Sequence, residues 1–153
     1  MAFDAFLKIE GIEGESADRT HPGEIEISSF SWGVANTGGG STGGGGTGKA
    51  VLQDFSFSMA TSKASPNLML ACATGKHFPE AALTIRRGDF EFMKIRLSDC
   101  LVSSYSLGGD NTHSSEDPDS PHDSMSINFV KIDFLYTVQR TGETVDTTFD
   151  PRL

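Results

Sequence analysis

The sequence predicts a mainly β fold, either a barrel or a tightly curled sandwich, with one short flanking helix. Three observations support this prediction. Hydrophobic and polar residues alternate along most of the chain, which is the period of a half-buried strand. The alternation slips by one residue at several points, as at a β-bulge where a strand bends. One short segment is instead almost continuously apolar and is flanked by residues that begin and end helices.

The first expected strand covers residues 3–10, where Phe3, Ala5, Leu7 and Ile9 share one face. A second begins near Ile25 and changes parity at Ser28-Ser29. Later strands are expected at 51–59, at 83–97 with a turn at 87–89 and a slip at Phe92-Met93, at 100–107 as a separate strand or a continuation, and at 125–138 with a slip after Phe129.

The helix is expected between Ser65 and Gly75, over about residues 66–74. Ser65 is a residue type that caps helix N-termini, and Pro66 lies where its missing N–H has no cost. Gly75 supplies the left-handed position that commonly follows a helix. Residues 68–73 are nearly all apolar, so this short helix must pack against the β body.

Length and charge exclude several classes of protein. A chain of 153 residues fits one domain, and its formal net charge of −9 disfavours binding to nucleic acid or to anionic lipid. No apolar run approaches the roughly 18 residues that span a bilayer, so no membrane insertion is expected. Two cysteines do not form a disulfide framework, and residues 1–10 do not resemble a signal peptide. We therefore expect the chain to begin in a reducing cytosol.

Two loops contain patterns that imitate ligand sites. The glycine-rich loop at residues 36–48 matches two phosphate-binding patterns, but a strand follows it where a phosphate cradle needs a helix. The acidic loop at residues 108–124, which includes Asp123, lacks the spacing of a calcium loop. Its histidines, His113 and His122, are weak evidence for a metal. We expect two exposed connections that contribute nothing to a core, and neither cofactor nor metal.

Catalysis has one candidate pair in the sequence, Cys72 with His77. A nucleophilic thiol needs a lowered pKa and a base within hydrogen-bonding distance. Cys72 lies in the apolar helix segment, where a thiol behaves as a small hydrophobe, and His77 follows the helix end. No other arrangement of nucleophile and base is recognisable, so the sequence predicts no enzyme and no catalytic residue.

Several blocks of sequence together resemble one protein family. They are Met1 to Glu15 (MAFDAFLKIEGIEGE), Phe30 to Gly33 (FSWG), Gln53 to Phe57 (QDFSF), Lys63 to Pro66 (KASP), Leu68 to His77 (LMLACATGKH), Leu101 to Tyr105 (LVSSY) and Ser124 to Tyr136 (SMSINFVKIDFLY). In this order they resemble the Hcp family, the tube protein of bacterial type VI secretion systems. The resemblance covers most of residues 1–139 and implies a curled two-sheet β-barrel with one flanking α-helix, followed by a short polar tail at 140–153.

The resemblance also implies a function. Family members form hexameric rings that stack into a hollow tube, which a sheath expels with its spike and its effector cargo. The resemblance implies that subunits assembled in the cytosol are secreted to the outside or into a target cell by this machine, without a signal peptide. The family's loop between the second and third strands reaches the adjacent ring, and here that loop consists of Asn36, Thr37, Gly38, Gly39, Gly40, Ser41, Thr42, Gly43, Gly44, Gly45, Gly46, Thr47 and Gly48.

Two alternatives remain open at this point. The chain could be the tube subunit of a related phage-tail-like injection particle, which shares the fold. It could also be a monomeric β-barrel that acts as an adhesin or binds a ligand with aromatic faces such as Phe30-Ser31-Trp32. A monomer with an open apolar pocket would favour the latter, whereas a closed ring would favour a tube.

Overall fold

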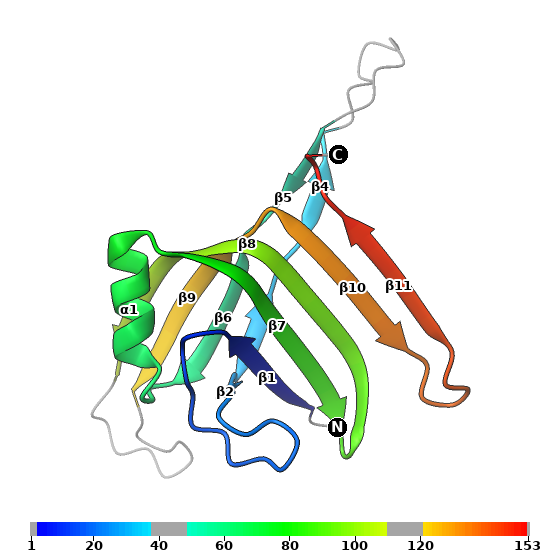
Figure 1. Ribbon diagram of the computed structural model, residues 1–153, viewed down its shortest axis with the longest axis horizontal. Helices are drawn as coiled ribbons and strands as arrows, with labels where there is room; N and C mark the ends of the chain where they lie inside the picture. The colour runs from blue at the N-terminus through cyan, green and yellow to red at the C-terminus, as the bar shows by residue number, and fades with distance from the viewer. Residues whose placement is uncertain (1–2, 38–48, 110–120, 153) are drawn as a thin grey trace.

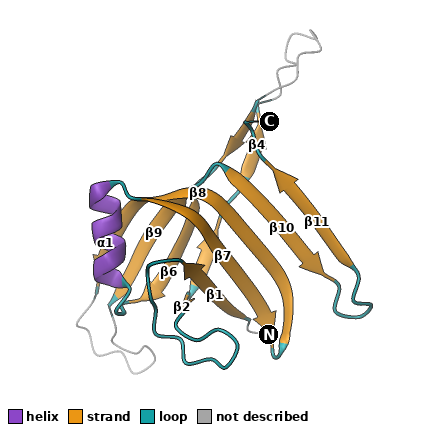
Figure 2. Cartoon of the chain, in the orientation of Figure 1, coloured by secondary structure: helices purple, strands orange, loops and turns teal. Residues whose placement is uncertain are grey.

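The computed structural model describes residues 3–37, 49–109 and 121–152 and has a mainly β fold with one helix flanking a curled sheet (Figures 1 and 2). The elements in chain order are β1 Asp4–Ile9, β2 Ile25–Glu26, β3 Ser29–Ser31, β4 Val34–Asn36, β5 Ala50–Leu52, β6 Phe55–Ala60, α1 Ser65–Thr74, β7 His77–Arg87, β8 Phe90–Gly108, β9 His122–Asn128, β10 Lys131–Thr137 and β11 Thr144–Phe149.

Nine strands form one antiparallel sheet, and β4 and β5 form a separate two-stranded sheet. The main path runs β2-β1-β7-β8-β9-β6-β3, and the hairpin β10–β11 joins it through β8. The predicted class, with two sheets and a flanking helix, is confirmed. The strands curl around a core without closing into a complete barrel (Figure 1).

Strand β8 produces the curl because its two halves pair with different partners. Residues 90–101 pair with β7, and residues 93–98 also pair with β10 on the opposite edge. Residues 101–108 pair with β9. The register shifts between Val102 and Ser104, and Asp99 has a positive φ of 55°. These irregularities bend one continuous strand between two parts of the sheet, so residues 100–107 are its continuation.

The parity slips in the sequence correspond to real breaks in the strands. Between β7 and β8 the register shifts so that Ile85 pairs with Met93 and Arg86 with Glu91, which leaves Phe92 as the extra residue of a bulge. At the earlier slip the chain changes partner, since Ile27 donates its N–H to Ala5 O of β1 and Ser28 donates to Ser58 O of β6. The slip after Phe129 separates β9 from β10.

The helix begins differently from the sequence-based expectation. Pro66 lies in its first turn, and Gly75 ends it in the left-handed conformation with φ 67°, as predicted. The expected cap is wrong, because the N-cap residue is Ala64 and no side chain caps the backbone. Ser65 is instead the first helical residue, and its hydroxyl is turned toward the sheet, where it binds Asp123.

The core lies between the inward faces of the curled sheet and under α1. Its largest fully buried side chains come from elements far apart in sequence and include Leu7, Phe55, Met59, Leu68, Leu83, Ile95, Leu97 and Ile127. The helix contributes Leu68 and Ala71 to this core. The segment after residue 139, predicted as a polar tail, contributes β11, which pairs along its whole length with β10.

In the described part of the chain no helix has the length and hydropathy of a membrane span.

Candidate functional site

The predicted stacking loop rises from the hairpin β4–β5. Val34 pairs with Leu52 and Asn36 with Ala50, and beyond them Thr37 donates its N–H to Lys49 O at 3.0 Å. Lys49 in turn donates its own N–H to the hydroxyl of Thr37 at 3.0 Å. Of the thirteen predicted loop residues, the structure describes only Asn36 and Thr37, and residues 38–48 lie outside it. The stem shows that the two ends of the loop are held together.

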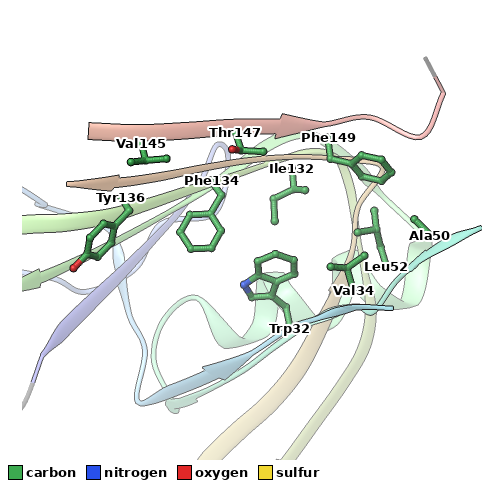
Figure 3. A pocket seen from close by; sticks show the side chains of 10 residues that line it. All are labelled: Trp32, Val34, Ala50, Leu52, Ile132, Phe134, Tyr136, Val145, Thr147 and Phe149. Atoms are coloured by element: carbon green, nitrogen blue, oxygen red, sulfur yellow. The ribbon is translucent and has the colours of Figure 1, made fainter. Parts of the chain in front are cut away.

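An open apolar groove lies between this hairpin and the hairpin β10–β11 (Figure 3). Its volume is about 490 Å³. Trp32 and Phe134 meet edge to face inside it, with ring centroids 6.1 Å apart and an interplanar angle of 63°. No charged side chain is among the residues that line it, which are Trp32, Val34, Ala50, Leu52, Ile132, Phe134, Tyr136, Val145, Thr147 and Phe149. Such a surface can bind apolar groups.

A second surface is made almost entirely of serine hydroxyls. The register of β3, β6, β9 and β8 aligns them in two rows across the four strands. One row is Ser29, Ser58, Ser124 and Ser106, and the other is Ser31, Ser56, Ser126 and Ser104. We call these eight residues the serine face. Intervening residues such as Phe57 and Met125 point into the core, because successive side chains in a strand alternate between its faces.

The hydroxyls of the serine face bind one another. Ser29 and Ser58 are joined at 2.5 Å between their Oγ atoms, and Ser104 and Ser126 at 2.6 Å. Ser106 donates to Ser124 O at 3.3 Å. The face is therefore polar, and its eight serines carry no charge on a chain with a formal net charge of −9. The sequence shows these serines one by one, but only strand register reveals that they form a lattice.

Asp123 was predicted to belong to an exposed acidic loop, and this prediction is wrong. Its side chain lies in β9 and is fully buried. It accepts hydrogen bonds from Thr61 Oγ1 at 2.8 Å, from Ser65 Oγ at 2.5 Å and from Tyr105 OH at 2.9 Å. Burial and then this carboxylate raise the pKa of the Tyr105 hydroxyl. The acid therefore ties the start of α1 to the sheet.

His21 forms a second polar cluster that sequence reasoning missed. Its Nδ1 lies 3.0 Å from Glu24 Oε2, and its Nε2 lies 2.8 Å from Glu91 Oε2. Its ring also stacks on Phe6 at 4.6 Å. Burial lowers the pKa of the His21 imidazole, but the two carboxylates outweigh burial and raise it above the ordinary value. The His21 ring thus links the segment before β2 to the start of β8.

The neighbouring Arg86 adds to this cluster. Its guanidinium lies over the Phe6 ring at 4.9 Å and binds both carboxylate oxygens of Asp18. The hydrogen bonds with Arg86 hold the pKa of Asp18 well below its usual range, and they raise that of Arg86. Arg86 and His21 together anchor the long connection between β1 and β2. Charged residues spaced this far apart in sequence give no local pattern that predicts the pairing.

Cys72 and His77, the one candidate pair that the sequence offered for catalysis, are not joined by a hydrogen bond in the structure. Cys72 is half-buried and packs against the core from α1, and His77 is exposed at the start of β7. Cys100, the other cysteine, is buried and donates its thiol to Leu97 O at 3.2 Å, and burial raises its pKa to about 12. Within the ranges that the structure describes, no three histidine, cysteine or acidic side chains converge as a metal site would require. His113 lies outside those ranges.

Comparisons with known proteins agree along nearly the whole chain. A family model described as "Type VI secretion system effector, Hcp" matches residues 6–136. The chain is 40% identical over 151 residues to Protein hcp1 of Pseudomonas aeruginosa, covering 95% of this chain and 90% of that protein.

Solved structures show the same fold. The crystal structure of Hcp1 from Salmonella typhimurium matches with a TM-score of 0.84 and 34% identity, over 99% of this chain and 97% of that one. A type VI secretion system effector from Yersinia pestis matches with a TM-score of 0.79 and 31% identity, over 96% and 99%. The family match, the relative and the shared fold agree, and the chain belongs to the Hcp family, the tube proteins of type VI secretion systems.

Proposed function

We propose that this chain forms hexameric rings that stack into the conduit of a type VI secretion system and carry effectors to target cells. The observation that carries the proposal is the match to the Hcp family over residues 6–136, together with a fold shared over 99% of the chain. The described surfaces fit this role, since they comprise an apolar groove and a neutral face. The groove provides a place for contact between copies, and the serine face, which is uncharged, can form the wall of the conduit.

The serine face is the described surface that best fits the inside of the conduit. Its side chains are short, so they leave space for a passing protein. It is uncharged, so neither acidic nor basic cargo would be held there by long-range attraction or repelled from it. An acidic wall would instead exclude acidic cargo. The effector cargo, the sheath and the spike belong to the same proposal as partners of the assembled tube.

Stacking of rings is assigned to the loop at residues 36–48. Its stem, β4–β5, extends from one end of the molecule beyond the curled sheet (Figure 1). Thr37 and Lys49 hold the two ends of the loop together at the tip of this stem. A loop that begins and ends at the tip of a subunit can contact the next ring. Residues 38–48 themselves lie outside the described structure, so this role rests on the family resemblance and on the stem.

We assign the chain a structural role and no catalytic one. The thiol of Cys100 is buried, and Cys72 packs as a hydrophobe.

We also propose that the chain assembles in the cytosol and is released by the secretion machine. Release can be tested by comparing culture supernatants of cells with an intact and an inactivated secretion machine. Detection of the chain outside both kinds of cell in equal amount would contradict this route.

Native mass spectrometry with negative-stain microscopy tests the assembly directly. We expect six copies of the 16.4 kDa chain in a ring-shaped particle. A monomer that remains at high concentration and binds an apolar ligand in the groove would instead support the ligand-binding alternative. The groove between β4–β5 and β10–β11 is the specific observation that favours a ligand-binding monomer as the second candidate.

A further inference from the structure

Two uncharged apolar surfaces lie at opposite ends of the molecule. One is the groove between β4–β5 and β10–β11, and the other is the outward face of α1. Figure 1 shows the helix at one end of the curled sheet and the hairpin β10–β11 at the other. Figure 3 shows the groove side chains between the two hairpins, and Val34 and Val145 among them are exposed.

The outward face of α1 is unusually apolar for an exposed helix. Leu68 and Ala71 point into the core, whereas Met69 and Leu70 are 49% and 56% exposed. The sequence of the helix, SPNLMLACAT, contains no charged residue. A surface helix of a monomer ordinarily has polar or charged residues on its outward face. Met69 and Leu70 therefore form an apolar ridge at this end of the molecule.

The side chains of the groove are also exposed to solvent. Val34 and Val145, on its two opposing walls, are each 56% exposed, and Tyr136 and Phe149 are partly exposed. One wall is β11, which among the described strands pairs only with β10. An edge strand that presents Val145 and Phe149 to water is a ready place for another chain to bind.

We propose that the ridge of α1 from one copy packs into the groove of the next copy. This inference rests on the proposed ring and names its contact. Copies with a net charge of −9 repel one another, and the ridge and the groove are two surfaces where they can meet without bringing charges together. Because the two surfaces differ, the contact is head-to-tail. Head-to-tail contacts generate a ring when the rotation between copies closes.

Cross-linking between copies tests the contact. In a Cys72→Ala background, Leu70→Cys would be placed on one chain and Val145→Cys on another, and the mixed proteins would be treated with a bis-maleimide. We expect covalent dimers from the mixture and none from either chain alone. A chain with both cysteines should give a ladder that ends at six. Dimers from Leu70→Cys alone would show a symmetric helix-to-helix contact and would overturn the proposal.

Charge substitutions separate this contact from the existence of the ring. Leu70→Glu and Val145→Glu should each convert rings to monomers, since each places a carboxylate in an apolar contact. Thr144→Glu is the matched control, because it adds the same charge to β11 at a position that does not line the groove. We expect it to keep the ring. If the unsubstituted chain forms no ring, the proposed function fails; if it does and both substitutions leave the ring intact, only this inference fails.

The single tryptophan reports on the groove without modification. Trp32 lines the groove and should be shielded from acrylamide in the ring, because a neighbouring helix covers it. In the Leu70→Glu monomer we expect stronger quenching of Trp32 fluorescence with the same far-ultraviolet circular dichroism. Equal quenching in the ring and in the monomer would show that the groove stays open in the ring, and the proposal would be wrong.

Discussion

The hydroxyl of Ser65, the first residue of α1, donates a 2.5 Å hydrogen bond to Oδ2 of Asp123 in β9. The sequence places these two residues in a helix cap and in an exposed loop, and the structure brings them together inside the protein. Thr61 and Tyr105 donate to the same carboxylate. Three hydroxyl donors compensate for the loss of hydration of a fully buried acid. The helix is therefore held by a polar contact as well as by Leu68.

Replacing Asp123 by alanine should destabilise the fold. The substitution leaves three hydroxyl donors, of which that of Ser65 is buried, without their acceptor, and we expect the free energy of unfolding to fall by about 3 kcal/mol. Urea denaturation would measure it. Tyr105→Phe removes one donor only and should cost about 1 kcal/mol. Asp146→Ala, at an exposed position in β11, is the control. Equal stability of Asp123→Ala and Asp146→Ala would refute the anchoring role.

The His21 cluster should make stability depend on pH. The pKa of His21 is raised in the folded state, so its contribution is fully present below the unfolded value of about 6.5 and is lost as pH rises through the folded pKa. We expect His21→Gln to lower the free energy of unfolding by roughly 1 kcal/mol more at pH 5.5 than at pH 9. His77→Gln, at an exposed position, is the matched control. The same loss for His21→Gln at both pH values would exclude an ionic role.

Shortening the glycine-rich loop should separate ring formation from stacking. Residues 38–48 can be replaced by Asn-Gly, because Thr37 and Lys49 already face each other across the hairpin. We expect rings of normal mass with shorter tubes in negative-stain images. Tubes as long as those of the unmodified chain would show that the loop does not connect rings.

Added salt should favour tubes over single rings. Each copy has nine more acidic than basic residues, so charges on facing rims repel one another until salt screens them. Ordering a glycine costs more conformational entropy than ordering any other residue, so a glycine-rich stacking contact should be weak. The ratio of tubes to rings, counted by microscopy from low to high ionic strength, checks this. A ratio of tubes to rings that does not change with ionic strength would contradict the electrostatic explanation.

The serine face should lie inside the ring. Ser106→Cys in a Cys72→Ala background would carry a maleimide-linked gold cluster, and we expect its density within the central channel in ring images. Glu80→Cys, at an exposed position on β7, is the control for a label elsewhere on the subunit. Density from Ser106→Cys at the outer rim would assign another surface to the conduit wall.

Local sequence patterns determined which segments became strands and helix. Alternation of period two depends only on neighbouring residues, so it identified most of the strands, and the slip at Phe92 identified a true bulge. It missed β11, whose segment was predicted as a polar tail. Pro66 and Gly75 marked the helix ends because each acts through its own backbone. Blocks of residues were also sufficient to recognise the family, since a family is defined by sequence.

Only the tertiary structure decided what the polar side chains do. Ser65 could cap a helix or bind a distant acid, and its partner lies 58 residues away. His21 and Glu91 are separated by 70 residues, and the serine face exists only in the register of four strands. These contacts depend on which segments pair across the sheet, and a period-two pattern is the same for every possible partner. The groove likewise requires two hairpins that no local pattern brings together.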